Sequence, residues 1–100
     1  MADPNHLRIL KQGAKAFNGW RAKNPDIVSN LVKANLSGAD LSGADFRKVH
    51  LSEANLSNSD LSGADLRWAN LKGVNLSGAK LHRTYLRDAR LSWANLSGVN

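Results

Sequence analysis

Residues 34–43 read ANLSGADLSG, which is one five-residue unit written twice. The unit continues in both directions, because a leucine or phenylalanine recurs every five residues from Leu31 to Leu96 without a slip. Two residues before each of them lies a small or β-branched residue, most often alanine. The unit therefore reads Ala-(Asp/Asn)-Leu-Ser-Gly, and fourteen copies of it occupy residues 29–100.

A period of five fits neither an α-helix nor a flat strand, because successive leucines fall about 140° apart on a helix and on opposite faces of a strand. The chain must turn within every unit, and Gly at the fifth position and Asn or Asp at the second are typical turn residues. The first and third positions are expected to point inward. Arg47, Arg67 and Arg87 recur at a lag of twenty residues, which favours a coil of four sides and about 3.5 coils in all.

This register resembles that of the pentapeptide-repeat family. The resemblance implies an all-β solenoid, namely a right-handed quadrilateral β-helix. The right hand comes from the resemblance alone, and so does the four-sided shape apart from the modest support of the twenty-residue lag. Phe17, Trp20, Arg21, Asn24 and Pro25 also resemble a leader that precedes the repeats in some cyanobacterial members.

Residues 1–28 are expected to form an N-terminal α-helical cap on the β-helix of residues 29–100. The Asp3–Pro4 pair predicts a helix start, and apolar residues follow at helical spacing, namely Leu7, Leu10, Ala14, Phe17 and Trp20. Gly13 and the Asn18–Gly19 pair weaken the helix internally, and we expect a bend or break near Asn18. The Asn24–Pro25 pair predicts the helix end. The cap should cover open strand edges of the first coil. A partner-binding or membrane-surface helix is the alternative, since cations are frequent here.

The composition argues against catalysis. Without cysteine there is no disulfide, thiolate zinc site or cysteine nucleophile. His6, His50 and His82 fall on the leader and on two different sides, so they are not expected to share a metal. The serines repeat as turn residues and not as nucleophiles, and no phosphate-binding loop is present. We expect no enzyme activity and no cofactor.

No stretch approaches the roughly 20 apolar residues of a membrane span. The residues after Met1 do not read as a secretory signal either. These features predict a cytoplasmic protein without a membrane segment.

Tryptophans and arginines gather late in the repeats. They form a candidate interaction surface of Arg67, Trp68, Arg83, Tyr85, Arg87, Arg90 and Trp93. The alternative is structural: the rings rest on a glycine or on the stem of Lys48, and the arginine column pairs with carboxylates such as Asp45 and Asp65. The column of Asn35, Asn55, Asn75 and Asn95 is interpreted as turn support.

The leucines of the last coil are predicted to face an uncovered end. They are Leu81, Leu86, Leu91 and Leu96, and they form a candidate end-on assembly surface. Such an end could pair with a second copy, dock another protein or continue into a longer repeat array.

A non-catalytic structural or protein-interaction module is the function that these features favour, with a protein as the expected partner. The alternative is a nucleic-acid role through the basic late coils, since the net charge is +6. Some members of the family resembled imitate duplex DNA and inhibit or protect DNA gyrase. That mimicry requires an acidic rod, so it is disfavoured for this basic chain.

Overall fold

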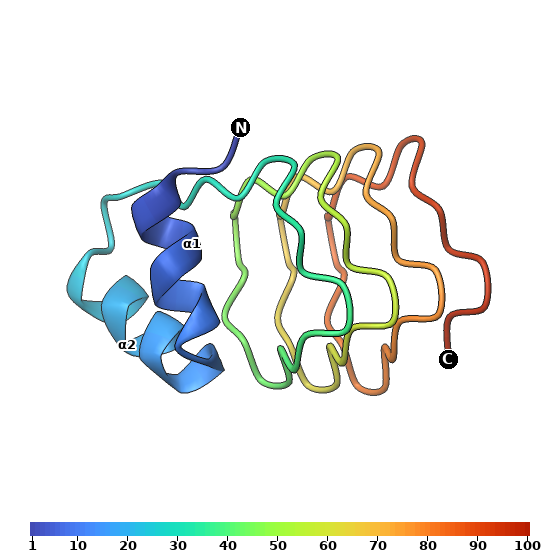
Figure 1. Ribbon diagram of the computed structural model, residues 1–100, viewed down its shortest axis with the longest axis horizontal. Coiled ribbons are helices and arrows are strands. Elements are labelled where there is room, and N and C mark those ends of the chain that lie inside the picture. The colour runs from blue at the N-terminus through green and yellow to red at the C-terminus, as the bar shows by residue number, and fades with distance from the viewer.

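The molecule is a four-sided coil with a pair of helices at one end. The computed structural model describes residues 1–100 and measures 35 × 23 × 22 Å. The helices α1 (Pro4–Lys11) and α2 (Ala14–Lys23) come first in the chain and lie against the first coil, and the C-terminus lies at the opposite end (Figure 1). Neither helix has the length and apolar character needed to cross a lipid bilayer.

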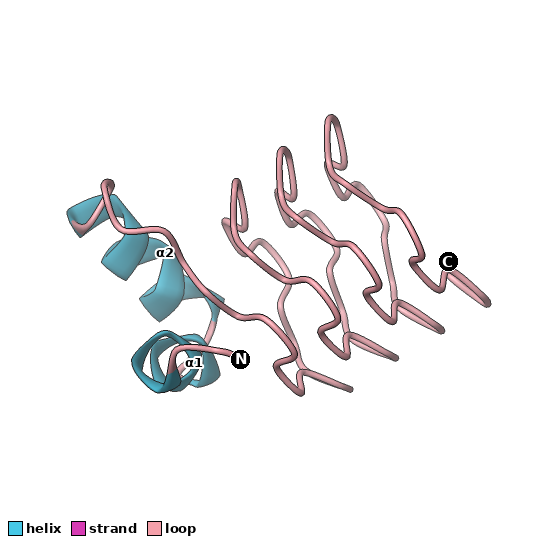
Figure 2. Cartoon of the chain, turned by 90° about the horizontal axis from the view of Figure 1, so that it is seen from above, coloured by secondary structure: helices cyan, strands magenta, loops and turns pink.

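Each repeat forms one side of the coil. Parallel β-bridges join residues twenty apart, so that Asn30 pairs with His50 and His50 with Asn70, and one turn of the coil is twenty residues long. The stacked turns are visible from above in Figure 2. We number the sides by their residues: side 1 is 30–33, 50–53, 70–73 and 90–93, side 2 is 35–38, 55–58, 75–78 and 95–98, side 3 is 40–43, 60–63 and 80–83, and side 4 is 45–48, 65–68 and 85–88.

The corners of the coil are tight turns with the expected chemistry. The fifth position has positive φ in all fourteen repeats, in six glycines and in eight other residues. At the second position, Asn75 Oδ1 accepts hydrogen bonds from the Ser77 N–H (3.0 Å) and from Ser77 Oγ (2.7 Å). The predicted turn roles of these positions are therefore confirmed.

The interior is filled by the first and third positions, as predicted. Apart from Ala39, each such residue from 29 to 79 is buried. The core continues into the cap through Leu10 and Phe17, whose ring centre lies 5.5 Å from that of Phe46. One apolar core therefore joins the helices to the coil.

The predicted bend near Asn18 is wrong. The chain turns instead at Gly13, where φ is 115°, and α2 runs unbroken through Asn18 and Gly19. Asn18 stays helical because its side chain binds the first coil: Nδ2 donates to the Gly43 carbonyl (3.0 Å), and Oδ1 accepts from the Asp45 N–H (2.7 Å). The other two helix boundaries are confirmed, with Asp3 as N-cap and the helical segment ending at Lys23.

The cap takes the place of a preceding coil. Along the exposed edge of side 1, the Asp3 N–H donates to the Asn30 carbonyl, and the Asn30 N–H donates to His6 Nδ1, both at 3.0 Å. On side 4, Arg21 Nη1 donates to the Asp45 carbonyl at 2.8 Å. These bonds satisfy strand-edge groups that a further coil would otherwise pair. The helices are thus the cap that the sequence predicted.

Candidate interaction surfaces

The structure divides the seven residues of the candidate interaction surface among three sides. Side 4 carries Arg67, Trp68, Tyr85 and Arg87, side 1 carries Arg90 and Trp93, and side 3 ends with Arg83. The two tryptophans therefore do not share a side. That these residues bind a partner stays a prediction.

On side 4, the first two arginines of the column are held by carboxylates. Arg47 Nε and Nη2 donate to Asp45 at 2.8 and 2.9 Å, and Arg67 Nε and Nη2 donate to Asp65 at 2.9 and 2.6 Å. The hydrogen bond from Arg47 holds the pKa of Asp45 below its ordinary value, and Arg67 has the same effect on the pKa of Asp65. The ion-pair interpretation therefore accounts for Arg47 and Arg67, the first two arginines of the column.

The third arginine of the column, Arg87, has different surroundings, because Tyr85 lies two residues before it where the earlier coils have aspartate. The guanidinium carbon of Arg67 lies 5.8 Å from the centre of the Tyr85 ring. Arg87 reaches only Asp88, at 3.6 Å, and both side chains are well exposed. The late part of side 4 therefore lacks the two-bond pairing of the earlier coils, and Arg87 has only this longer, exposed contact.

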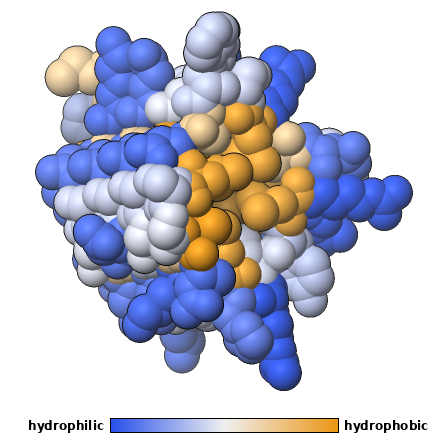
Figure 3. Space-filling view, turned by 90° about the vertical axis from the view of Figure 1, so that its right-hand side faces the viewer, coloured by the Kyte–Doolittle hydropathy of each residue, from blue (hydrophilic) through white to orange (hydrophobic).

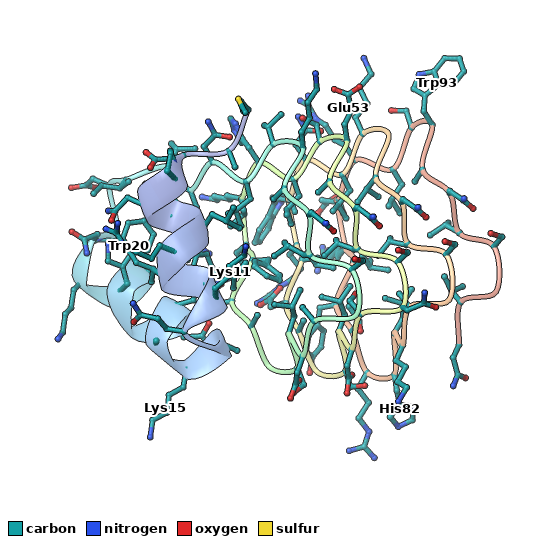
Figure 4. The ribbon with its side chains drawn as sticks, viewed as in Figure 1. Lys11, Lys15, Trp20, Glu53, His82 and Trp93 are labelled. Carbon is teal, nitrogen blue, oxygen red and sulfur yellow. The ribbon has the colours of Figure 1, made fainter.

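The two tryptophans lie in different surroundings. The ring centre of Trp68 lies 5.9 Å from Lys48 Nζ and 5.6 Å from Arg67 Cζ, and the residue is 49% exposed. Trp93 is 85% exposed and projects from the coil (Figure 4), and it lines a surface pocket together with Glu53, Lys72 and Gly73 among others. The structural interpretation therefore fits Trp68, whereas the ring of Trp93 is free to contact a partner.

The last coil presents an apolar end. Leu81, Leu86 and Leu91 are partly exposed and Leu96 is 43% exposed, whereas the leucines one coil earlier are buried. Figure 3 shows the resulting apolar patch on this end of the molecule, with polar side chains around it.

This end is also an open strand edge. One coil earlier, the N–H groups of Leu66, Leu71 and Leu76 donate to carbonyls of the last coil at 2.8 Å. The corresponding N–H groups of Leu86, Leu91 and Leu96 have no backbone acceptor. The end therefore combines exposed leucines with unpaired ladder groups.

Sequence reasoning missed a third surface, a groove between α1 and α2 with a volume of about 680 Å³. It is lined by Ile9, Gln12, Lys15, Ala16, Gly19, Trp20 and Lys23. The groove exists because the helical segment breaks at Gly13 and folds back on itself. The sequence signal for it is the one that raised a partner-binding or membrane-surface helix as the alternative to a cap, since residues 4–25 contain five Lys or Arg and no Asp or Glu.

Comparison with known proteins agrees with this geometry. The pentapeptide repeats family matches residues 29–67 and 64–100, with eight copies of its unit. The chain belongs to the pentapeptide repeat family. Pentapeptide repeat proteins form right-handed quadrilateral β-helices, and this one does so with α1 and α2 as its cap. No curated protein matches the chain.

Two solved structures are similar over most of this pentapeptide repeat protein. A pentapeptide repeat protein from Nostoc PCC 7120 is 32% identical with a TM-score of 0.77, over 98% of this chain and 74% of that one. One from the Arabidopsis thaliana thylakoid lumen is 38% identical with a TM-score of 0.69, over 72% of this chain and 50% of that one. The chain thus spans half of the Arabidopsis protein, and its similarity to the Nostoc protein includes the helices.

Proposed function

We propose that this pentapeptide repeat protein is a non-catalytic protein-binding module that pairs with a second copy of itself through the end of its last coil. The observation that carries the proposal is the coincidence of exposed leucines and unpaired backbone N–H groups at that end. Exposed apolar surface favours burial, and an open strand edge favours pairing with another strand.

The cap decides which kind of pairing is available. Head-to-tail stacking would require the last coil to meet the first coil of the next copy, but α1 and α2 cover that coil. Two last coils can instead face each other across a two-fold axis, which gives a closed dimer and no filament. Strands related in this way run antiparallel and can complete each other's ladders.

The size of the end predicts weak pairing. With lateral dimensions of 23 and 22 Å, the face offers at most roughly 500 Å² per copy, or roughly 1,000 Å² in total. This is near the lower limit for a specific interface. We therefore expect a dimer that forms and dissociates with protein concentration.

Sedimentation equilibrium tests the proposal with two matched substitutions. Leu96→Lys places a charge in the apolar end. Ile27→Lys is the control, because it places the same charge on the cap side, and the two side chains are similarly exposed, Ile27 by 45% and Leu96 by 43%. The wild type and Ile27→Lys should form dimers at micromolar concentration, and Leu96→Lys should stay monomeric. A wild-type monomer at high micromolar concentration, or equal loss in both variants, would contradict the proposal.

Direct nucleic-acid binding is the second candidate. It is favoured by the exposed cations Arg83, Arg87 and Arg90 of the last coil, together with the free ring of Trp93. Binding to a short DNA duplex should then be strong at low salt and fall steeply as salt is added. If no binding is measurable at low salt, this candidate is excluded.

We also propose a cytoplasmic location, the compartment that the sequence features predict. The Arabidopsis relative comes from the thylakoid lumen, so the location needs its own test. Fractionation of cells that produce the tagged protein would supply it, and recovery in a lumenal or periplasmic fraction would contradict the proposal.

A further inference from the structure

The groove between α1 and α2 has an apolar floor and a basic rim. Ile9 from α1 and Ala16 and Trp20 from α2 supply the apolar part, and Lys15 and Lys23 stand at the rim. Leu10 and Phe17 of the same helices are buried. Ile9 and Trp20 pack against this core from its edge and stay partly exposed, so the groove opens on the outer border of the apolar strip that joins the helices to the coil. In Figure 4, Lys15 extends away from the coil.

The charges around this groove are uncompensated. The helices contain no acidic residue, and of their cations Arg21 pairs with Asp45 at 3.1 Å and Arg8 donates to Asn5. Lys15 and Lys23 are exposed and form no ion pair. A ligand that carries carboxylates would therefore be electrostatically complementary to the two lysines of the rim.

The fold of the cap does not require glycine at position 19, but Gly19 lines the groove. A Cβ atom at this position would meet nothing within 4 Å, and its φ is not positive. Glycine inside a helix costs about 1 kcal/mol relative to alanine. The missing side chain leaves the surface of α2 open beside Ala16, so that another backbone can approach closely.

We propose that this groove binds an acidic amphipathic helix of a partner protein. The apolar stripe of that helix would lie on Ile9, Ala16 and Trp20, in the helix-in-groove mode of recognition. Lys15 and Lys23 are eight residues apart, about 12 Å along α2, so carboxylates two helical turns apart can reach both. The site is at the opposite end from the proposed dimer surface and does not depend on it.

A synthetic peptide tests the proposal on the full chain by fluorescence anisotropy. The probe is a labelled helix-forming peptide of about sixteen residues with leucine on one face and glutamate elsewhere. A second peptide with lysine in place of glutamate is the control. We expect only the acidic peptide to bind saturably to the wild type. The acidic peptide should bind the variant Lys15→Gln/Lys23→Gln about tenfold more weakly, since two exposed ion pairs contribute up to about 1 kcal/mol each. Lys80→Gln makes the same kind of charge change on side 3 and should leave binding unchanged.

Gly19→Gln separates binding from folding. Its side chain should fill the groove and abolish binding, while Tm stays equal or rises because glutamine favours a helix more than glycine does. The proposal is overturned if neither peptide binds, if both bind equally, or if Gly19→Gln binds as well as the wild type. It is also overturned if phosphatidylglycerol vesicles bind through Lys15 and Lys23 while the acidic peptide does not.

Discussion

Asn18 shows that one side chain can reverse a local preference. By propensity, asparagine followed by glycine weakens a helix. In the folded protein, however, Asn18 Oδ1 accepts from the Asp45 N–H, as the carbonyl of a preceding coil would, and Nδ2 also donates to the Gly43 carbonyl at the corner. The helix passes through this position because the coil needs those two bonds.

Two neighbouring substitutions should have opposite effects on stability. Asn18→Ala improves helix propensity but leaves the ladder N–H of Asp45 unpaired and removes the bond to the Gly43 carbonyl, and we expect it to lower the free energy of unfolding by about 1–2 kcal/mol. Gly19→Ala meets no neighbouring atom and should raise it by up to about 1 kcal/mol. Urea unfolding measures both. Stabilisation by Asn18→Ala would mean that its tertiary bonds are unimportant.

At the scale of one element, side 4 combines turn formation with charge pairing. Asp45 and Asp65 each accept from the backbone N–H and the guanidinium of an arginine two residues later. Arg21 of the cap also reaches Asp45. These carboxylates therefore support the corners and neutralise Arg47 and Arg67, and Asp45 also holds the cap.

These carboxylates should make the protein sensitive to acid. Their pKa values are lower in the folded protein than in the unfolded chain, so in acid the unfolded chain binds more protons. The stabilisation is complete above the ordinary carboxyl pKa of about 3.9 and is lost as the pH falls through the folded values. Tm should therefore fall below about pH 4.

The variant Asp45→Asn/Asp65→Asn provides the control for this prediction. It should have a lower Tm at neutral pH and a shallower decline in acid, when thermal unfolding is followed by circular dichroism. Two curves that run parallel through the acid range would show that other groups cause the decline.

The coil could be predicted from the sequence because its causes are local and repeated. Each unit carries its own turn residues and interior residues, so the pattern can be recognised from the neighbouring units even where one unit departs from it. The choice between the two weak points of the helix, Gly13 and Asn18, could not be predicted, since the bonds of Asn18 are made to the first coil and not to its neighbours in sequence. The seven residues of the candidate interaction surface share the late coils, which the sequence shows, but not one side. Trp93 follows Trp68 by one full turn plus one side, so it lies on the next side of the coil.

At the scale of the whole molecule, burial depends on having a coil on both sides. Leu66 is fully buried between two coils, whereas Leu91 has a coil on one side only and is partly exposed. In such stacks, stability comes largely from contacts between nearest neighbours.

The same truncation should therefore cost different amounts along the stack. Leu66→Ala should lower the free energy of unfolding by about 2–5 kcal/mol, as is usual for a buried leucine. Leu91→Ala should cost less than half as much at low protein concentration. Urea titrations of the monomer provide the comparison, and equal losses would mean that the last coil is as well packed as the middle.

The twenty-residue turn also limits how such a gene can change in length. Because all four sides place the same residue types inside, loss of a single five-residue unit from a middle coil leaves the interior filled. Every later residue, however, moves by one side relative to the cap, so that Arg87 passes from side 4 to side 3. Insertion or deletion of a whole turn therefore keeps each surface residue on its side of the coil. Insertion or deletion of a single unit moves the later surface residues to other sides while the core stays filled.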